Sequence, residues 1–391
     1  MPLVNMKDML AHAHADGYAV AAFDLVGLDF LEAIMSAAEK TRAPVILSLA
    51  ESHFDYFDFE LAMAATVAAA KRASVPVAIH LDHGHTLQSA VRGIRFGCTG
   101  VMVDASAHPF EENVRLTKEV VDMAHGCGVP VEGELGYVPG VEGEDAERHP
   151  GEIAYTTPEE AERFVAATGV DFLAVSIGTV HGRMKGEPKL DFERLAAINE
   201  RLNMPLVIHG GTGLSGEQFR RLIENGVTKI NYYTALSDAA AAAIAANVNK
   251  GAKGYTAQVA GVREAIAAEC ARCIELWGSA GKAQEVLAAA RPWREVEHVI
   301  IYNAQGISEE EADAMAAEGR RVLAAIPGVR YVMSGKAVQE DARYRRCWLA
   351  RFVQPEVIDS FRDHPDHVRF ADQRFRPVAG GRISIDYLLD E

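Results

Sequence analysis

Apolar segments of strand length alternate with segments of helix length from the start of the chain to about residue 250. Eight segments have strand character: YAVAAFD (18–24), APVILSLA (43–50), VPVAIHLDH (75–83), GVMVDAS (100–106), PVEGELG (130–136), FLAVSIG (172–178), LVIHGG (206–211) and KINYYT (229–234). Nearly continuous apolar strands with helices between them indicate a parallel sheet that is covered on both faces. Eight evenly repeated units favour a (β/α)8 TIM barrel over a doubly wound open sheet.

Polar side chains occur at or near the C-terminal ends of these predicted strands. They are His83, Asp104, Glu134, His209 and Asn231, and His181 follows the sixth strand closely. Active sites of TIM barrels form at this end of the strands. We therefore expect the functional site at the mouth of the barrel.

Three of these residues are histidines from three different units, His83, His181 and His209. Three neutral imidazoles with an open fourth position suit a catalytic Zn²⁺ ion, which can polarise a carbonyl or stabilise an enediolate. A single histidine is more often a satisfied buried residue, but the set of three favours a metal site. The His-x-His pattern of His83 and His85 also occurs in metal hydrolases, usually on the first barrel strand, whereas here it lies on the third.

Carboxylates adjoin this predicted metal site. Asp82 precedes His83 and can shuttle a hydroxyl proton, although a helix N-cap is the alternative role. The polar segment 133–155 is rich in Gly and Pro, and loops of that length are usually functional or mobile. Glu142 and Glu144 are candidate bases on it, and for Glu144 we prefer a solvated surface position.

Two small-residue turns follow the last two strands of the predicted barrel. They are HGGTGLSGEQF (209–219) and NYYTALSD (231–238). Backbone N–H groups at a helix N-terminus attract phosphate, and phosphate sites of TIM barrels commonly form in these two units. The turns therefore predict a phosphate site.

Charge and cysteine content narrow the class of protein. The formal net charge of −16 argues against general nucleic-acid binding. The five cysteines are odd in number and scattered, which is typical of reduced thiols in a cytoplasm. No segment has the length of a membrane span or the pattern of a signal peptide. We expect a cytoplasmic protein that binds neither nucleic acid nor membrane.

The sequence changes character after about residue 280. GSAGKAQ marks a break, and the following segments have the order β-α-β-β-α-β of a ferredoxin-like layer. We predict a TIM barrel with a C-terminal helical arm over 1–280, a linker over 281–296, and a small α+β domain over 297–391.

The barrel segments resemble the class II, zinc-dependent fructose/tagatose-bisphosphate aldolase family. The resemblance is carried in family order by YAVAAFD, AIHLDHG, VMVDAS, VEGELG, SIGTVHG, LVIHGGTGL and VTKINYYTAL. It implies reversible cleavage of a ketose (bis)phosphate to dihydroxyacetone phosphate and an aldehyde, a reaction of carbohydrate metabolism and glycolysis. It also implies a divalent metal, usually Zn²⁺, a monovalent cation such as Na⁺ or K⁺, and a homodimer or homotetramer.

The resemblance implies a role for each matching residue. Asp82 takes the C4 hydroxyl proton, the metal holds the enediolate, and Glu142 returns a proton to it. His83, His181 and His209 are the metal ligands, and Glu134 and Asp104 line a possible second metal position. The remaining matches bind the phosphate and enediolate of the donor, and Asn231 among them is also a catalytic residue: Gly182, Lys185, Gly210, Gly211, Thr212, Asn231, Tyr233 and Thr234.

The aldehyde end departs from the family pattern. Ala50 stands where Ser or Thr usually helps to bind the second phosphate, with Ser52 nearby, and Tyr232 and Tyr233 are bulkier than expected. Arg263 matches an arginine that a neighbouring subunit contributes to that phosphate, or it is an ordinary surface residue. The acceptor aldehyde, whether phosphorylated, sulfonated or otherwise anionic, therefore stays open.

The C-terminal segment resembles the stress-responsive α/β-barrel (Dabb) family, on the IPGV turn and FRDHPDHVRF. Such domains usually dimerise by pairing their sheets, so we expect this one to assemble or cap the enzyme. His364 and His367 are candidate ligand-binding residues, with fold and turn roles as the alternative. Two other functions stay open: a metal-dependent TIM-barrel hydrolase and a non-catalytic aldolase-like scaffold.

Overall fold

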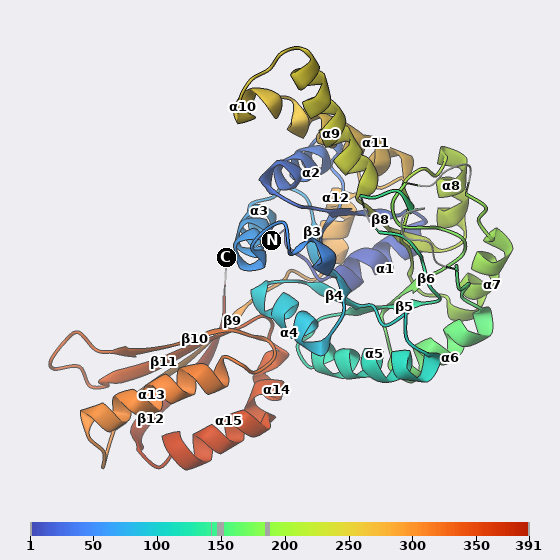
Figure 1. Ribbon diagram of the computed structural model, residues 1–391. Helices are drawn as coiled ribbons and strands as arrows, with labels where there is room; N and C mark the ends of the chain where they lie inside the picture. The colour runs from blue at the N-terminus through green and yellow to red at the C-terminus, as the bar shows by residue number, and fades with distance from the viewer. Residues whose placement is uncertain (1, 142, 147–151, 184–187, 390–391) are drawn as a thin grey trace. The chain divides into compact units, whose positions relative to one another are not determined.

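The first part of the chain is a closed barrel of eight parallel strands, and β8 pairs with β1 to close it (Figure 1). The computed structural model describes all residues except 1, 142, 147–151, 184–187 and 390–391. The strands are β1 (Val20–Asp24), β2 (Val45–Ala50), β3 (Val77–Gly84), β4 (Gly100–Val103), β5 (Val131–Leu135), β6 (Phe172–Val175), β7 (Leu206–Ile208) and β8 (Val227–Tyr232). The predicted TIM barrel is confirmed.

Helices surround these strands and connect one to the next. They are α2 (Leu28–Thr41), α3 (Phe59–Lys71), α4 (Leu87–Phe96), α5 (Phe110–His125), α6 (Pro158–Thr168), α7 (Phe192–Leu202), α8 (Gly216–Glu224), α9 (Thr234–Asn249), α10 (Tyr255–Gln258) and α11 (Val262–Leu276). A capping box of Ser215 and Gln218 begins α8 and so fixes where the preceding glycine-rich turn ends.

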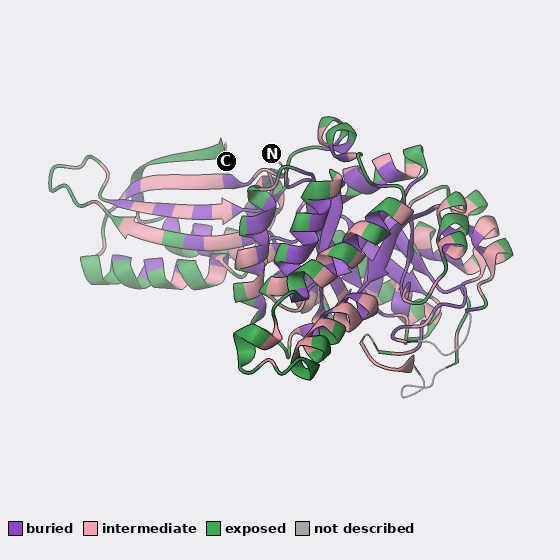
Figure 2. Ribbon diagram, turned by 90° about the horizontal axis from the view of Figure 1, so that it is seen from above, coloured by how far each residue is buried: buried purple, intermediate pink, exposed green. Residues whose placement is uncertain are grey.

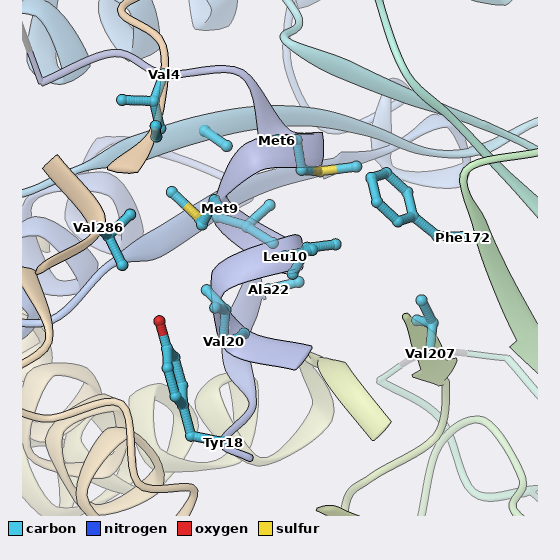
Figure 3. Close-up of a cluster of buried hydrophobic side chains, with 14 of the residues drawn as sticks. Val4, Met6, Met9, Leu10, Tyr18, Val20, Ala22, Phe172, Val207 and Val286 are labelled. Carbon is cyan, nitrogen blue, oxygen red and sulfur yellow. The ribbon is translucent and has the colours of Figure 1, made fainter. Parts of the chain in front are cut away.

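The N-terminal end of the barrel is closed by helix α1 (Met6–Asp16), whose apolar side chains enter the core (Figure 3). Met6, Met9 and Leu10 are buried with residues of the strands, such as Val20 and Phe172. Helix α12 (Ala283–Ala289) adds Val286 to this cluster. Because this end is filled with apolar side chains, the opposite end is left for polar groups.

Figure 2 shows the barrel strands buried and the surrounding helices exposed on their outer sides. Several charged or titratable side chains inside the strands are exceptions to this apolar pattern. Among them are His80, Asp82, Glu132 and Lys229, each without solvent exposure. Buried charges are costly unless they are paired. Their presence therefore indicates that the interior below the barrel mouth serves a function besides stability.

Residues from Trp293 onward form the main part of a second compact unit. Its antiparallel sheet has the order β10-β11-β9-β12. The elements are β9 (Val296–Ala304), α13 (Glu309–Leu323), β10 (Val329–Lys336), β11 (Arg346–Phe352), α14 (Val357–Asp363), α15 (Pro365–Phe370), the π-helical turn η3 (Ala371–Phe375) and β12 (Ala379–Leu388). This confirms the predicted β-α-β-β-α-β domain, and the interval 281–296 contains helix α12.

In the described part of the chain no helix is long and apolar enough to cross a membrane. The five cysteines are free thiols. Cys270 and Cys273 lie buried on α11, and burial raises the pKa of the Cys273 thiol to about 12. These two thiols have the properties of core residues.

Candidate active site

The end of β3 presents two consecutive side chains, Asp82 and His83, to the site. A regular strand would point neighbours to opposite faces. The pairing of β3 with β4 shifts register between Leu81 and Gly84, and His83 has a left-handed φ of 45°. Bulges of this kind re-aim side chains beside active sites. As a result, His83 Nε2 lies 4.0 Å from Asp82 Oδ2.

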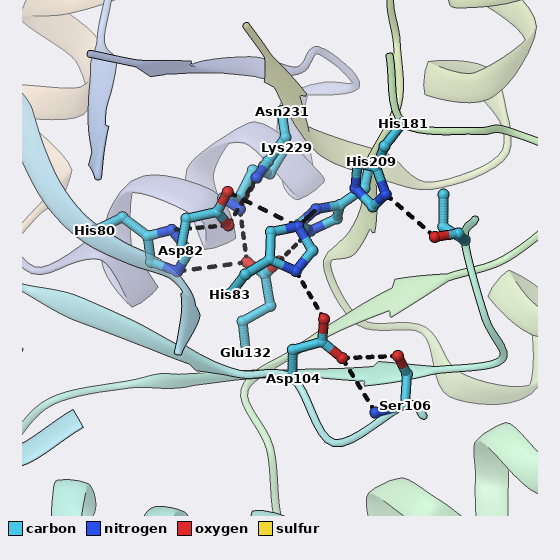
Figure 4. Close-up of polar contacts among 11 residues, drawn as sticks. His80, Asp82, His83, Asp104, Ser106, Glu132, His181, His209, Lys229 and Asn231 are labelled. Atoms are coloured by element: carbon cyan, nitrogen blue, oxygen red, sulfur yellow. Dashed lines mark hydrogen bonds and ion pairs between the residues drawn. The ribbon is translucent and has the colours of Figure 1, made fainter. Parts of the chain in front are cut away.

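Closure of the barrel brings together three histidines from three different units (Figure 4). His83, His181 and His209 each offer one nitrogen atom, and these atoms lie within 4.8 Å of one another. His83 Nε2 is 2.9 Å from His209 Nδ1. All three rings are largely buried. The predicted triad is therefore one cluster in space.

The second nitrogen of each ring is held by a fixed hydrogen-bond partner. His83 Nδ1 is 2.8 Å from Asp104 Oδ2, and His209 Nε2 is 2.9 Å from Glu132 Oε1. His181 Nδ1 donates to the carbonyl oxygen of Val138 at 3.2 Å. Such partners select the tautomer and the orientation of metal-binding imidazoles. The three rings are thus oriented as a set.

His181 tests whether these residues fit a metal ion. Because its Nδ1 donates to a carbonyl, Nε2 carries the lone pair of the neutral ring. That atom is buried and has no hydrogen-bond partner among the described residues, a state that is costly. Burial lowers the pKa of His181 to about 4, which favours the neutral form that ligates metal. The site therefore fits a cation.

The two predicted second-position residues, Asp104 and Glu134, lie beside His83 and form a cluster with it. Asp104 also accepts hydrogen bonds from the backbone and hydroxyl of Ser106. Burial, reinforced by the Asp104 carboxylate, raises the pKa of Glu134 well above its usual value. A cation nearby would offset that cost.

The predicted base Asp82 is fully buried and is held by Asn231. Asn231 Nδ2 donates to Asp82 Oδ1 at 2.8 Å. Burial alone would raise the pKa of Asp82, but His83, His209 and Lys229 outweigh it and lower that pKa. Asp82 Oδ2 has no hydrogen-bond partner in the described part of the chain. This oxygen is the atom available to take a proton.

A buried ion pair that the sequence analysis missed lies beneath the histidines. Lys229 Nζ is 2.8 Å from Glu132 Oε2 and donates to Asn231 Oδ1 at 2.6 Å. Because Lys229 holds the amide oxygen of Asn231, the amide nitrogen faces Asp82. Glu132 in turn holds His209, so the pair connects a candidate metal ligand to the candidate base (Figure 4).

A simple signal could have found these residues. His80, Glu132 and Lys229 each stand two positions before a predicted site residue on the same strand. Residues i and i+2 of a strand share a face. A charged side chain two positions before a site residue therefore lies in the next layer of the same barrel interior.

Three turns at the barrel mouth, after β6, β7 and β8, carry the predicted phosphate-binding residues. Gly182 and Gly210 have left-handed φ values of 84° and 71°, and a Cβ atom on either would collide with a backbone carbonyl oxygen. Thr234 Oγ1 accepts a hydrogen bond from Gly143 N at 3.0 Å. Helix α9 begins at Thr234 without a side-chain cap, which leaves its first amides suited to an anion.

Other predicted residues are distributed as follows. Gly211 is buried and Thr212 half-buried in the turn after β7. The Tyr233 ring packs against His53 with 4.4 Å between centroids. Arg263 is 55% exposed and pairs with Glu32 and Asp29 on α2. Glu142 and Lys185 lie outside the described residues.

The residues after β2 form another part of the mouth, next to Tyr233 of the turn after β8. Glu51 accepts from the backbone N–H of His85 and from the Ser89 hydroxyl, both at 2.7 Å. His53 is buried, and burial lowers its pKa to about 4, with opposing influences of Asp82 and His83. A neutral imidazole therefore borders the predicted base.

Comparison with known proteins relates both parts of the chain to described families. Residues 4–282 match the class-II fructose-bisphosphate aldolase family, and residues 296–389 match the stress responsive A/B barrel domain. A fructose-bisphosphate aldolase of Geobacillus stearothermophilus is 42% identical over 291 residues, which are 73% of this chain and 100% of that protein.

Two further proteins that are similar to this chain are also aldolases by name. A probable fructose-bisphosphate aldolase of Bacillus subtilis (strain 168) is 44% identical over 237 residues, 60% of this chain and 82% of that protein. The crystal structure of the YdjI aldolase from Escherichia coli K12 superposes with a TM-score of 0.65 and 36% identity, over 72% of this chain and 99% of that chain.

Proposed function

The chain belongs to the class-II fructose-bisphosphate aldolase family, and from this premise we propose that it cleaves a ketose phosphate reversibly to dihydroxyacetone phosphate and an aldehyde. The observation that carries the proposal is the triad of His83, His181 and His209, each with its second nitrogen held by a partner. A hydrolase of the same barrel class would use such a triad too, but it would hydrolyse its substrate and would not cleave a carbon–carbon bond.

These three histidines would hold the metal, for which we propose Zn²⁺. Three nitrogen donors with an open position fit this ion. When bound, it would polarise the ketose carbonyl and stabilise the negative charge that develops on the donor half. Glu134 and Asp104 would line a second metal position, since they cluster with His83.

Asp82 would take the proton of the C4 hydroxyl. Its Oδ1 is occupied by Asn231, and its Oδ2 is left for the substrate. Loss of that proton lets the C3–C4 electron pair move to the donor half as the C4–O bond becomes a carbonyl. Glu142 would then return a proton to C3. Its neighbour Gly143 is fixed by Thr234, so this segment is anchored at the mouth.

The turns after β6, β7 and β8 would bind the donor phosphate. Gly182, Gly210 and Gly211 lie in these turns, where side chains would leave less room for a phosphate, and the N-terminus of α9 adds its positive end. Thr212, Asn231, Tyr233, Thr234 and Lys185 complete the proposed donor site. A monovalent cation, Na⁺ or K⁺, would sit near this phosphate.

The acceptor end would be formed by the residues after β2. Glu51 and His53 lie there, and Ala50 offers no hydroxyl to a phosphate. Arg263 would reach the acceptor phosphate only of a neighbouring subunit, because it pairs with Glu32 and Asp29 in its own chain. This combination supports a hydroxylated acceptor aldehyde more than a second phosphate.

A proton-exchange experiment tests the proposal without knowledge of the aldehyde. The protein is incubated with dihydroxyacetone phosphate in D₂O, and loss of the C3 proton signal is followed by NMR with and without EDTA. Exchange that depends on metal establishes the donor half-reaction. Absence of exchange by metal-replete protein would exclude this donor and leave a hydrolase or a scaffold.

We also propose that the protein acts in the cytoplasm as a homodimer or homotetramer. The family assembles in this way by resemblance, and the C-terminal sheet offers an outer face for it. On β12, Ile383, Ile385 and Tyr387 are 40–49% exposed on one face. Exposed apolar patches of this kind mark interaction surfaces.

A further inference from the structure

The end of β3 carries His83 in a backbone conformation that needs support. Among the described residues, three besides the glycines have a left-handed φ, and two of them, Arg42 and Asn203, follow the ends of helices, where this conformation is common. His83 is the third and lies within a strand, with a φ of 45°. A side chain in this region is sterically unfavourable and persists only where surrounding groups fix it. The turn from β3 to α4 therefore depends on contacts from other elements.

Glu51 supplies such contacts from the neighbouring unit of the barrel. It begins the short helix η1 (Glu51–His53), which directly follows β2. One carboxylate oxygen, Oε2, accepts the backbone N–H of His85 at 2.7 Å. The other oxygen, Oε1, accepts the hydroxyl of Ser89 at 2.7 Å. The carboxylate therefore joins the end of β2 to the turn after β3 and to the first turn of α4.

The start of α4 is arranged to receive this carboxylate. Thr86 Oγ1 accepts the backbone N–H of Ser89 at 3.0 Å, and the two hydroxyls lie 2.8 Å apart. Because the Ser89 hydroxyl donates to Glu51, the Thr86 hydroxyl donates to Ser89. Hydrogen bonds to an ionised acceptor are stronger than neutral ones, and the helix dipole favours a negative group at this end of α4. The contact from Glu51 is therefore a strong one.

The turn is held on both sides of the bulge. The carbonyl oxygen of Gly84 accepts the backbone N–H of Asp104 on the β4 side at 2.9 Å, and the next residue, His85, is held by Glu51. Between these anchors and the strand, His83 Nε2 lies 2.9 Å from His209 Nδ1. Since both oxygens of Glu51 accept donors of its own chain, its carboxylate serves the turn.

We propose that Glu51 is a positioning residue for the metal site. Its carboxylate holds the turn after β3 in the conformation that directs His83 to the other two histidines and Asp82 to the substrate. The hold on the turn is a property of the metal-free chain, whereas its effect on catalysis rests on the proposed function.

The test compares Glu51→Ala with Glu51→Gln in the full chain. Alanine removes both hydrogen bonds, whereas the glutamine amide keeps the shape, accepts from the His85 N–H and donates to the Ser89 hydroxyl. In metal-free protein, hydrogen–deuterium exchange of the amides in 83–89 should be roughly tenfold faster in Glu51→Ala. Competition with a chelator should show a zinc affinity roughly 10- to 100-fold weaker. Glu51→Gln should recover most of both losses.

Activity separates positioning from folding. At saturating zinc, the maximal rate of metal-dependent proton exchange on dihydroxyacetone phosphate should fall roughly tenfold in Glu51→Ala. The half-saturating concentration of dihydroxyacetone phosphate should change little, because the phosphate turns are untouched. Asp58→Ala is the matched control, since Asp58 caps α3, the helix after η1, through the Leu61 N–H at 3.0 Å. It should lower thermal stability but leave zinc affinity and amide exchange in 83–89 unchanged.

Ser89→Ala keeps the test decisive if Glu51→Ala fails to fold. It removes one of the two hydrogen bonds and should give smaller changes of the same sign. Unchanged amide exchange and zinc affinity in these variants, or equal effects of Glu51→Ala and Asp58→Ala on zinc affinity, would overturn the proposal. Lack of metal-dependent proton exchange by the unmodified chain would overturn the proposed function instead, and amide exchange of the metal-free chain would still decide the role of Glu51.

Discussion

Asp82 is the residue whose replacement separates metal binding from catalysis. Asp82→Asn keeps the shape of the side chain but cannot take the C4 proton. We expect carbon–carbon cleavage to fall roughly 10²- to 10⁴-fold, while bound zinc is retained because His83, His181 and His209 are untouched. Cleavage of the ketose phosphate and metal content by mass spectrometry measure the two effects.

The control for this variant is Glu340→Gln, which removes an exposed carboxylate in the second unit. It should leave both quantities unchanged. Proton exchange on dihydroxyacetone phosphate should survive in Asp82→Asn, since that half-reaction does not involve C4. Loss of zinc from Asp82→Asn would show instead that Asp82 is a ligand.

Lys229 has a positioning role that can be tested apart from catalysis. Lys229→Met leaves Glu132 buried without its cation and frees the amide of Asn231 to turn. Breaking a buried pair costs about 3–5 kcal/mol of stability, and loss of an outer-shell partner weakens metal binding roughly 10- to 100-fold. Denaturant titration and zinc competition with a chelator measure these changes.

A second substitution distinguishes charge from packing at this pair. Glu132→Gln combined with Lys229→Met removes both charges, so the double variant should regain much of the stability lost by Lys229→Met. Metal binding should stay weak, because an amide no longer holds His209 as a carboxylate does. Full recovery of zinc affinity would contradict the proposed link from Lys229 to the metal.

His53 gives the protein a defined sensitivity to acid. Its pKa is about 4 in the folded chain, against about 6.5 in an unfolded one, because burial disfavours the charged ring. Between these values only the unfolded state takes up the proton, so the free energy of unfolding decreases as pH falls from about 6.5 to about 4.

The variant His53→Gln should lose part of that acid sensitivity. One pKa unit corresponds to about 1.4 kcal/mol, so the difference between about 6.5 and about 4 amounts to at most about 3.5 kcal/mol. Urea unfolding of metal-free protein at several pH values measures it. His14→Gln, at a half-buried position on α1, is the comparison; equal slopes for the two variants would contradict the role of His53.

The sequence predicted those residues whose type and position along the chain already indicate their chemistry. Three histidines at strand ends predict a cluster because the fold brings strand ends together. Glu132 and Lys229 were missed, since each is an ordinary charged residue until its burial and its partner are known. Roles for the predicted residues stay predictions, because the structure gives their positions and not their chemistry.

At the scale of the elements, strand positions followed from apolar runs, but the bulge in β3 did not. Alternation places Asp82 and His83 on opposite faces, and only the register shift before Gly84 puts both at the mouth. Similarly, the second helix of the predicted β-α-β-β-α-β order is divided into α14, α15 and η3. Pro365 explains the first break, because proline cannot continue a helix from the preceding turn.

Gly84 makes the bulge in β3 testable. A Cβ atom there would lie 2.6 Å from the carbonyl oxygen of Met102 on β4. Gly84→Ala should therefore push the two strands apart and displace His83, with weaker zinc binding and a loss of stability of about 1–3 kcal/mol. Gly27→Ala, where a Cβ meets nothing within 4 Å and the backbone is extended as well, is the matched control and should leave zinc binding unchanged.

For the whole molecule, the change of pattern near residue 280 predicted two folds in one chain, and both are present. The domain limits stay predictions, since a helix with a residue in the barrel core, α12, lies inside the interval expected to be a linker. Helix α12 has seven residues, too few for the sequence pattern to reveal which core it joins. Three-dimensional packing decides that question.

Assembly is the prediction that belongs to the whole molecule. In the C-terminal sheet, Ile385 pairs with Val299 of β9, Ile383 and Tyr387 of the same strand are also exposed, and so is Met333 on the opposite edge strand β10. If a second copy covers this face, Ile385→Lys places a charge in an apolar interface, and desolvation of that charge disfavours association. Light scattering should then give half the particle mass, while metal-dependent proton exchange by the barrel persists.

Val338→Lys, at a position 92% exposed outside the paired strands, should leave the mass unchanged. An unchanged mass for Ile385→Lys would show that the copies associate through another surface.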